Sequence, residues 1–184
     1  MLRFQVVTGH EYRDLVASYL FENFQQYGLA VYTEISLGKT IIGKNRRIDV
    51  FVVRETDNKA LAIECKFQGG SGTTDEKIPY ALEDLGALRV AACLCYAGEG
   101  WSKGVLHTLE ASPLAVFCLP NPSLQRETST LELDHVIAAE FGLWTNVISE
   151  SRRFPPQPKG RLAERLPAKR APSRQELLKL DASE

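Results

Sequence analysis

A glutamate and a lysine lie two residues apart inside an otherwise apolar stretch, the segment ALAIECKFQ at residues 60–68. Because side chains alternate along a strand, Glu64 and Lys66 share one face while Cys65 points to the other. An unpaired carboxylate or ammonium group is costly to bury. These two charges therefore either satisfy each other or face a cleft in which something binds.

A second acid, Asp49, lies in the segment RIDVFVV, and the polar turn RETDNK connects this segment to the strand that carries Glu64. Facing residues of antiparallel strands are about 5 Å apart, so we expect the two carboxylates to point into one cleft. Two close carboxylates repel each other and favour a cation between them. Mg²⁺, for which Mn²⁺ can substitute, takes oxygen ligands and needs one or two protein carboxylates. With Lys66 beside the attacking water, this set of residues predicts phosphodiester hydrolysis.

The elements that would position these residues follow from the hydrophobic periodicity. It predicts helices at 9–28, 75–89, 100–112 and 131–143, and strands at 29–38, 47–53, 60–68, 90–98 and 114–120. The almost continuous apolar run VAACLCYAG is typical of a central strand that is covered on both faces. The order predicts an α/β (α+β) mixed sheet in which an antiparallel meander leads into helix-connected parallel strands.

The residues IDV and IECK, around Asp49 and Glu64, resemble the signature of the PD-(D/E)xK nuclease superfamily. The α-β-β-β-α-β core of that restriction-endonuclease-like fold is similar to the order expected over residues 9–120. The resemblance implies that Asp49 and Glu64 hold the metal and that Lys66 assists the attacking water. Ile48 departs from the pattern, since it stands where the name of the motif has proline.

The same resemblance implies two further residues of the site. Glu11, on the first helix, corresponds to a glutamate that reaches the metal in many members, and Gln68 matches a glutamine that recurs in some branches. We also expect the backbone carbonyl of Ile63 or Cys65 to serve as a metal ligand.

Structural explanations stand beside these assignments. Asp49, Glu64 and Lys66 would also suit an ion-pair cluster on a sheet face. Acids are favoured in the first turn of a helix by its dipole, which accounts for Glu11 equally well. Glu34 points to a polar strand face, where it either joins the site or meets solvent.

A basic turn precedes the Asp49 strand. Lys44, Arg46 and Arg47 are placed to contact DNA phosphates, with a solvated turn as the alternative. The segment GKTIIGKN, residues 38–45, nearly matches a phosphate-binding loop, but Asn45 replaces the serine or threonine and a strand follows instead of a helix. A nucleoside triphosphatase is therefore excluded.

Charge and composition suggest two regions. Residues 1–150 carry 13 basic and 19 acidic side chains and are expected to form the nuclease-like domain. Residues 151–184 carry 9 basic and 4 acidic side chains with five prolines, so this tail is expected to be extended or disordered. Such a tail would contact DNA or a protein partner, or remain a solvated terminus.

The four cysteines occur in apolar strand-like stretches without metal-ligand spacing, which favours buried reduced thiols. No apolar run approaches the roughly 18–20 residues of a membrane span, and we see no secretory signal. We therefore expect a cytoplasmic protein that does not bind membranes.

Together these features predict an Mg²⁺-dependent DNA endonuclease of the restriction, homing or phage, or repair or junction type. DNA would be the substrate, and a homodimer would bring two sites to two strands. The alternative is a non-catalytic nucleic-acid-binding or assembly protein on a nuclease fold.

Overall fold

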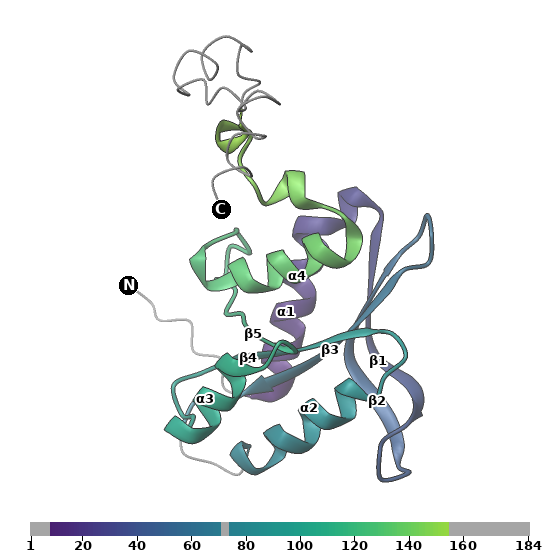
Figure 1. Cartoon of the computed structure of the whole chain (residues 1–184), viewed down its shortest axis with the longest axis vertical. Coiled ribbons are helices and arrows are strands. Elements are labelled where there is room, and N and C mark those ends of the chain that lie inside the picture. The colour runs from purple at the N-terminus through teal and green to yellow at the C-terminus, as the bar shows by residue number, and fades with distance from the viewer. Residues whose placement is uncertain (1–7, 71–73, 155–184) are drawn as a thin grey trace, which may run out of the picture. The chain divides into compact units, whose positions relative to one another are not determined.

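The computed structural model describes residues 8–70 and 74–154 of the 184-residue chain (Figure 1). The helices are α1 (Gly9–Phe24), α2 (Ile78–Gly86), α3 (Lys103–Ala111) and α4 (Leu131–Phe141), and the strands are β1 (Leu29–Lys39), β2 (Asn45–Arg54), β3 (Ala60–Phe67), β4 (Ala91–Ala97) and β5 (Ala115–Phe117). The order of elements predicted from the periodicity is confirmed. The first helix is shorter than expected, because a 3₁₀ turn follows Phe24 and Gly28 then takes a left-handed φ of 75°.

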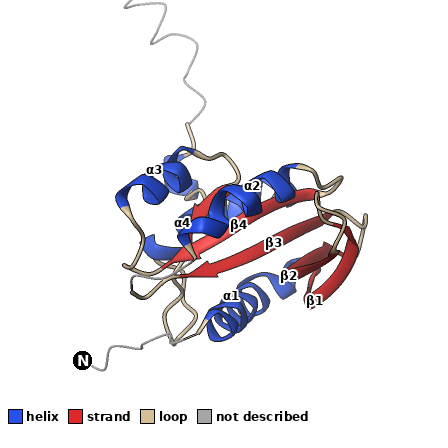
Figure 2. Ribbon diagram, turned by 90° about the horizontal axis from the view of Figure 1, so that it is seen from below, coloured by secondary structure: helices blue, strands red, loops and turns tan. Residues whose placement is uncertain are grey.

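The strands form one five-stranded mixed sheet in the order β1-β2-β3-β4-β5. The β1–β2 and β2–β3 pairs are antiparallel, whereas β3–β4 and β4–β5 are parallel. Helix α1 lies against one face of the sheet and α2 against the other (Figure 2). The mixed α/β architecture is therefore as predicted, with helices on both faces.

Two apolar clusters hold these layers together. On one face, α1 and α4 pack on the central strands through residues that include Val16, Leu20 and Ile137. On the other face, α2 and α3 pack on β4 through Ile78, Leu85 and Leu109. The four cysteines are buried and free, as the sequence predicts, and all belong to the α1 cluster: Cys65, Cys93, Cys95 and Cys118.

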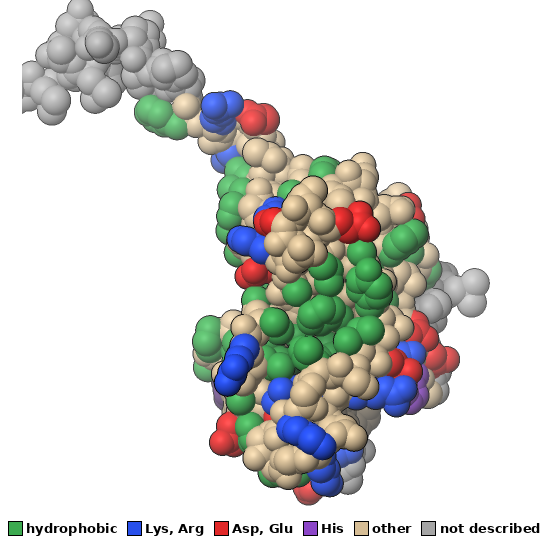
Figure 3. All heavy atoms as spheres, turned by 90° about the vertical axis from the view of Figure 1, so that its right-hand side faces the viewer, with side chains coloured by type: hydrophobic (Ala, Val, Ile, Leu, Met, Phe, Trp, Pro, Cys, Tyr) green, Lys and Arg blue, Asp and Glu red, His purple; other side chains and the backbone are tan. Residues whose placement is uncertain are grey.

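Some apolar side chains remain exposed on the surface of the molecule. Tyr32 of β1 is 48% exposed. Figure 3 shows apolar side chains gathered in the middle of one face, with lysine and arginine side chains below them. Contiguous apolar surface of this kind is typical of contact faces. Within the described residues, no helix is long and apolar enough to cross a membrane.

Contacts divide the chain into two units, residues 1–148 and 149–184. Of the second unit the structure describes residues 149–154, which include a short 3₁₀ turn at Glu150–Arg152. The expected basic tail, 151–184, therefore lies almost entirely outside the described residues.

One irregularity of the sheet positions the candidate site. The β2–β3 ladder ends at the pair Val50–Ile63, although β2 begins five residues earlier and β3 runs four residues further. Strand β2 is still paired with β1 at Asn45, Arg47 and Ile48. The backbone N–H of Cys65 therefore donates to a side chain of β2 and not to its backbone: the acceptor is Oδ2 of Asp49, at 2.8 Å. Asp49 thus lies where the two strands part.

Candidate active site

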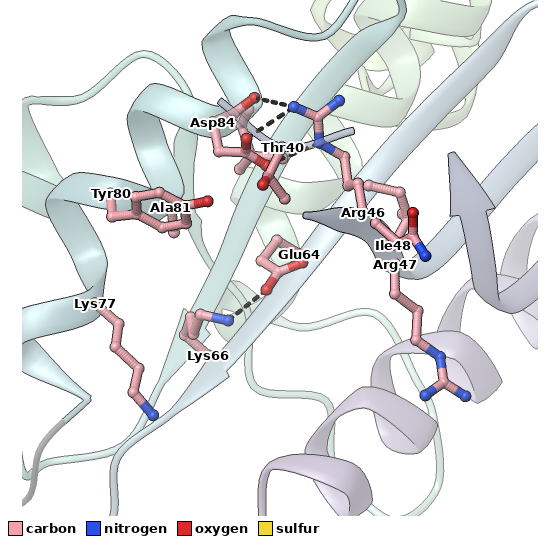
Figure 4. A pocket seen from close by; sticks show the side chains of 12 residues that line it. Thr40, Arg46, Arg47, Ile48, Glu64, Lys66, Lys77, Tyr80, Ala81 and Asp84 are labelled. Carbon is pink, nitrogen blue, oxygen red and sulfur yellow. Dashed lines mark hydrogen bonds and ion pairs between the residues drawn. The ribbon is translucent and has the colours of Figure 1, made fainter. Parts of the chain in front are cut away.

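Glu64 and Lys66 lie side by side on β3, on the face that α2 covers (Figure 4). Their side chains are 22% and 19% exposed, and the Lys66 ammonium donates to Oε1 of Glu64. The two charges therefore satisfy each other in part. They also line a cavity, so both explanations of this charged pair hold at once.

This first cavity has a volume of about 430 Å³ and lies between the tip of the β1–β2 hairpin, β3 and helix α2. Its lining combines charged, polar and apolar side chains: Thr40, Asn45, Arg46, Arg47, Ile48, Glu64, Lys66, Lys77, Tyr80, Ala81, Asp84 and Leu85. Figure 4 shows Lys77 and Tyr80 on the α2 side, across from Glu64. We call this space the α2 cavity.

A second cavity, also of about 430 Å³, adjoins the start of α1 and contains Asp49. His10 and Thr74 line it together with Cys65 and Phe67. Lys66 and Lys77 line both cavities. The two spaces are therefore neighbours that meet at a pair of lysines, with Glu64 on one side and Asp49 on the other.

The acids at this junction influence each other. Burial raises the pKa of Glu64 above its usual value, the Lys66 ammonium opposes this, and the Asp49 carboxylate raises the pKa further. The two carboxylates thus repel each other, although they line two adjoining cavities and not the single cleft that the sequence predicts. A bound cation would relieve that repulsion and lower the pKa of Glu64.

The donor set fits a hard divalent ion. In an extended strand the N–H and C=O of one residue point to the same neighbour, so the Cys65 carbonyl points toward Asp49, to which its N–H donates. Two carboxylates and a carbonyl leave the remaining positions to water, the arrangement that Mg²⁺ tolerates well. The described residues contain no group of three or more His, Cys, Asp or Glu side chains that could hold a metal ion.

Arg46 supports the wall of the α2 cavity. It lies in β2, and its guanidinium donates through Nε and a terminal nitrogen to the Asp84 carboxylate of α2, each at 2.8 Å. The backbone N–H of Ile41, in the hairpin tip, also donates to Asp84 at 2.8 Å. The expectation of a basic turn residue that is open to DNA needs correction here, because the Arg46 side chain is 9% exposed and already paired.

Lys44 and Arg47 keep the accessibility that a phosphate contact requires. Both are exposed, Lys44 in the turn and Arg47 in β2 at the mouth of the α2 cavity. Arg47 donates to Glu34, which also accepts from Arg13 of α1 at 2.7 Å. Glu34 therefore joins the surroundings of the site through two arginines instead of simply meeting solvent.

Gln68 follows the last residue of β3 and fixes the loops around the site. Its Nε2 donates to Asp75 and to the Gly100 carbonyl, each at 2.7 Å, and the residue is buried. Asp75 in turn accepts from the backbone N–H of Ser102, at the start of α3. These contacts give Gln68 a positioning role beneath the cavities, and it lines neither of them.

Glu11 takes part in a capping box at the start of α1. Its carboxylate accepts from the backbone N–H and the hydroxyl of Thr8, while its own N–H donates to the Thr8 hydroxyl. This geometry matches the helix-terminus explanation. Glu11 does not line the cavity that holds Asp49, although its neighbours Gly9 and His10 do.

Lys77 is the residue that reasoning from sequence missed. It precedes α2 directly and lines both cavities. The sequence could have indicated Lys77, because this lysine follows the glycine-rich segment that comes directly after the strand of Glu64.

The site and the sheet together define a class of protein. The model of the PD-(D/E)XK nuclease superfamily domain matches residues 8–144, most of the chain. The protein belongs to this superfamily, and the assignment made from the IDV and IECK residues is confirmed. The family points to a nuclease that acts on nucleic acid, in a class that generally depends on divalent metals.

Solved structures show weaker similarity. A protein of unknown function is 16% identical, with a TM-score of 0.38 and 56% of each chain covered. A repair endonuclease from Pyrococcus abyssi is 15% identical, with a TM-score of 0.34, 62% of this chain and 47% of its own covered. The chain thus spans about half the length of both structures. No curated protein matches the sequence.

Proposed function

We propose that this protein is a divalent-metal-dependent DNA endonuclease that hydrolyses phosphodiester bonds at the junction of the two cavities. The observation that carries the proposal is that Asp49 and Glu64 line two adjoining cavities, both of which Lys66 also lines. A purely structural ion pair would not require a second carboxylate and two adjoining cavities.

Asp49, Glu64 and the Cys65 carbonyl are the groups that would hold the metal. When bound, Mg²⁺ or Mn²⁺ supplies a Lewis acid for the phosphoryl oxygen and lowers the pKa of water. Either ion would also offset the burial and the repulsion by Asp49 that together raise the pKa of Glu64. Lys66 would then be released from part of its contact with Glu64.

Lys66 would orient the attacking water by donating a hydrogen bond to its oxygen. The water oxygen forms a bond to phosphorus and gives up a proton to solvent, while the P–O bond to one sugar breaks and the leaving sugar oxygen takes a proton from solvent. Negative charge grows on the phosphate oxygens in the transition state. Lys66 and Lys77 both line the cavities where that charge would develop, and preorganised cations stabilise it. Arg47, at the mouth, provides a sequence-independent phosphate contact.

A plasmid-nicking assay with Mg²⁺ and with Mn²⁺ tests the proposal. We expect cleavage that chelation abolishes and that Glu64→Gln or Lys66→Met reduces at least 100-fold. Glu83→Gln is the matched control, since this exposed glutamate on α2 lines neither cavity. Failure to cut duplex, single-stranded and branched DNA with either metal would instead favour a non-catalytic nucleic-acid-binding role. Cleavage that survives in Glu64→Gln would overturn the site.

We also propose that the protein acts as a homodimer, because cutting both strands of a duplex calls for two sites. The exposed apolar side chains in Figure 3 supply a candidate contact face. Sedimentation equilibrium that shows only monomer at assay concentrations and in the presence of DNA would refute this.

A further inference from the structure

The α2 cavity has an apolar wall that phosphate chemistry does not need. Ile48 and Leu85 are buried and line it together with Ala81. Tyr80, 36% exposed, adds an aromatic ring from α2, and Figure 4 shows it across the cavity from Glu64. A phosphate group or a hydrated ion gains nothing from these four side chains.

Polar groups line the same space. Thr40 and Asn45, at the tip of the β1–β2 hairpin, line the cavity and carry a hydroxyl and an amide that can both donate and accept hydrogen bonds. Lys66 and Lys77 supply positive charge where the α2 cavity meets the cavity that holds Asp49. These groups match the parts of a nucleotide. The apolar and aromatic wall suits the face of a base, the hydroxyl and the amide suit the polar edge of the base, and the two lysines suit the phosphate.

The cavity is also held open by contacts that do not depend on a ligand. Asp84 ties helix α2 both to Arg46 of β2 and to the Ile41 N–H of the hairpin tip. The volume of the α2 cavity, about 430 Å³, lies within the range of roughly 300–1,000 Å³ that is typical of small-molecule sites. A planar base can therefore enter a preformed space.

We propose that the α2 cavity binds one unstacked nucleobase of the DNA strand whose phosphate lies at Lys66 and Lys77. This inference rests on the proposed nuclease function and names its substrate class: DNA that carries an unpaired nucleotide at the cut, as in a single strand, a flap or a frayed end. A base inside a continuous duplex is stacked and paired, and extruding it costs free energy that an unpaired base does not require. Tyr80 is the stacking partner, because aromatic rings bind bases of any sequence through their faces.

Fluorescence anisotropy with the full chain tests this inference. The protein carries Glu64→Gln so that DNA is not cut, and the probes are a labelled single strand, a blunt duplex of the same sequence and a duplex with a single-stranded flap. We expect tighter binding of the single strand and the flap than of the blunt duplex. Tyr80→Ala should weaken binding of the two unpaired probes by roughly 5- to 100-fold, the range for loss of one base–aromatic stack. Tyr80→Phe, which keeps the ring, should stay within about twofold of the parent.

Two controls separate the cavity from the rest of the surface. Glu83→Gln changes an exposed residue of the same helix that lines neither cavity, and it should leave all three affinities unchanged. An abasic position moved along the single strand should weaken binding at one position only, and Tyr80→Ala should abolish that sensitivity. Thermal unfolding of each variant shows that it is folded.

The outcomes distinguish this inference from the proposed function. If Tyr80→Ala binds all probes like its parent, or if the blunt duplex binds as tightly as the single strand, the base-binding role is wrong even where metal-dependent cleavage stands. If Tyr80 governs binding of unpaired DNA but the wild-type chain cuts no DNA with either metal, the base site stands and the nuclease proposal fails. Absence of any DNA binding would overturn both.

Discussion

Asp84→Asn should destabilise the fold markedly, because Asp84 joins three parts of the α2 cavity. Its carboxylate accepts two hydrogen bonds from the Arg46 guanidinium and one from the Ile41 N–H. The side chains of Arg46 and Asp84 are only 9% and 11% exposed. An asparagine keeps the shape and one acceptor but removes the charge, so Arg46 would remain buried without its counter-ion.

The magnitude follows from that burial. Removing one partner of a buried ion pair costs about 3–5 kcal/mol. We expect the free energy of unfolding to fall by about 3 kcal/mol, at the low end of this range, because the asparagine oxygen still accepts a hydrogen bond. For a chain of this length that corresponds to a fall in Tm of about 6–12 °C. Urea unfolding followed by circular dichroism measures it, with the exposed Glu83→Gln on the same helix as a control that should stay within about 0.5 kcal/mol.

The pH dependence adds a second readout. The Arg46 hydrogen bond lowers the pKa of Asp84 below its usual value. A carboxyl group whose folded pKa is lowered stabilises the protein above its unfolded pKa, about 3.9, and loses this contribution as pH falls through the folded pKa. The difference in the free energy of unfolding between wild type and Asp84→Asn should therefore be largest at neutral pH and shrink below about pH 4. A loss under about 1 kcal/mol at pH 7, or a difference that grows on acidification, would refute the ion-pair explanation.

Three further predictions concern the supports of the sheet. Gly98→Ala should cost at least about 2 kcal/mol, because a Cβ would lie 2.2 Å from the Gln68 carbonyl oxygen at a φ of +104°; unchanged urea unfolding would contradict that close approach. Tyr19→Phe should cost about 1–3 kcal/mol, since its hydroxyl donates to buried Asp134 at 2.6 Å, and an unshifted thermal midpoint would show that the bond contributes little. Thr8→Ala should cost about 1 kcal/mol by removing the cap of α1, whereas Thr8→Ser should retain most of the stability in the same calorimetric scan.

The sequence predicted the sheet well because its signals are local. Apolar periodicity marked each strand and helix, and the unbroken apolar run of β4 correctly indicated a strand covered on both faces. The facing of Asp49 and Glu64 stays a prediction, because the β2–β3 ladder ends one pair before these two residues would meet. What the periodicity could not reveal is that the β2–β3 ladder stops at Val50–Ile63, because pairing is decided by the neighbouring strands.

The assignments that changed are those in which one residue type serves two purposes. The sequence suggests that Arg46, in a basic turn, contacts DNA. The structure shows that Arg46 is buried and paired with Asp84, which lies 38 residues later. Glu11 suits both a metal ligand and a capping residue; the Thr8 contacts show that it caps α1, and its role as a ligand stays a prediction. The partner of Arg46 is remote in the sequence and leaves no local mark, whereas Thr8 and Glu11 form a capping-box pattern that is local.

The backbone is irregular on both sides of Asp49, and this explains how the acid is presented. On the β3 side the ladder has ended and the Cys65 N–H bonds to the Asp49 side chain. On the β1 side the pairs at Thr33 and Ile35 flank Glu34, which has a φ of 57° and misses its own pair. A glutamate in this region is strained, and its two arginine partners offset that cost. A fully regular ladder would bond the Cys65 N–H to the β2 backbone, so the early end of the β2–β3 ladder leaves this N–H free to donate to the Asp49 carboxylate.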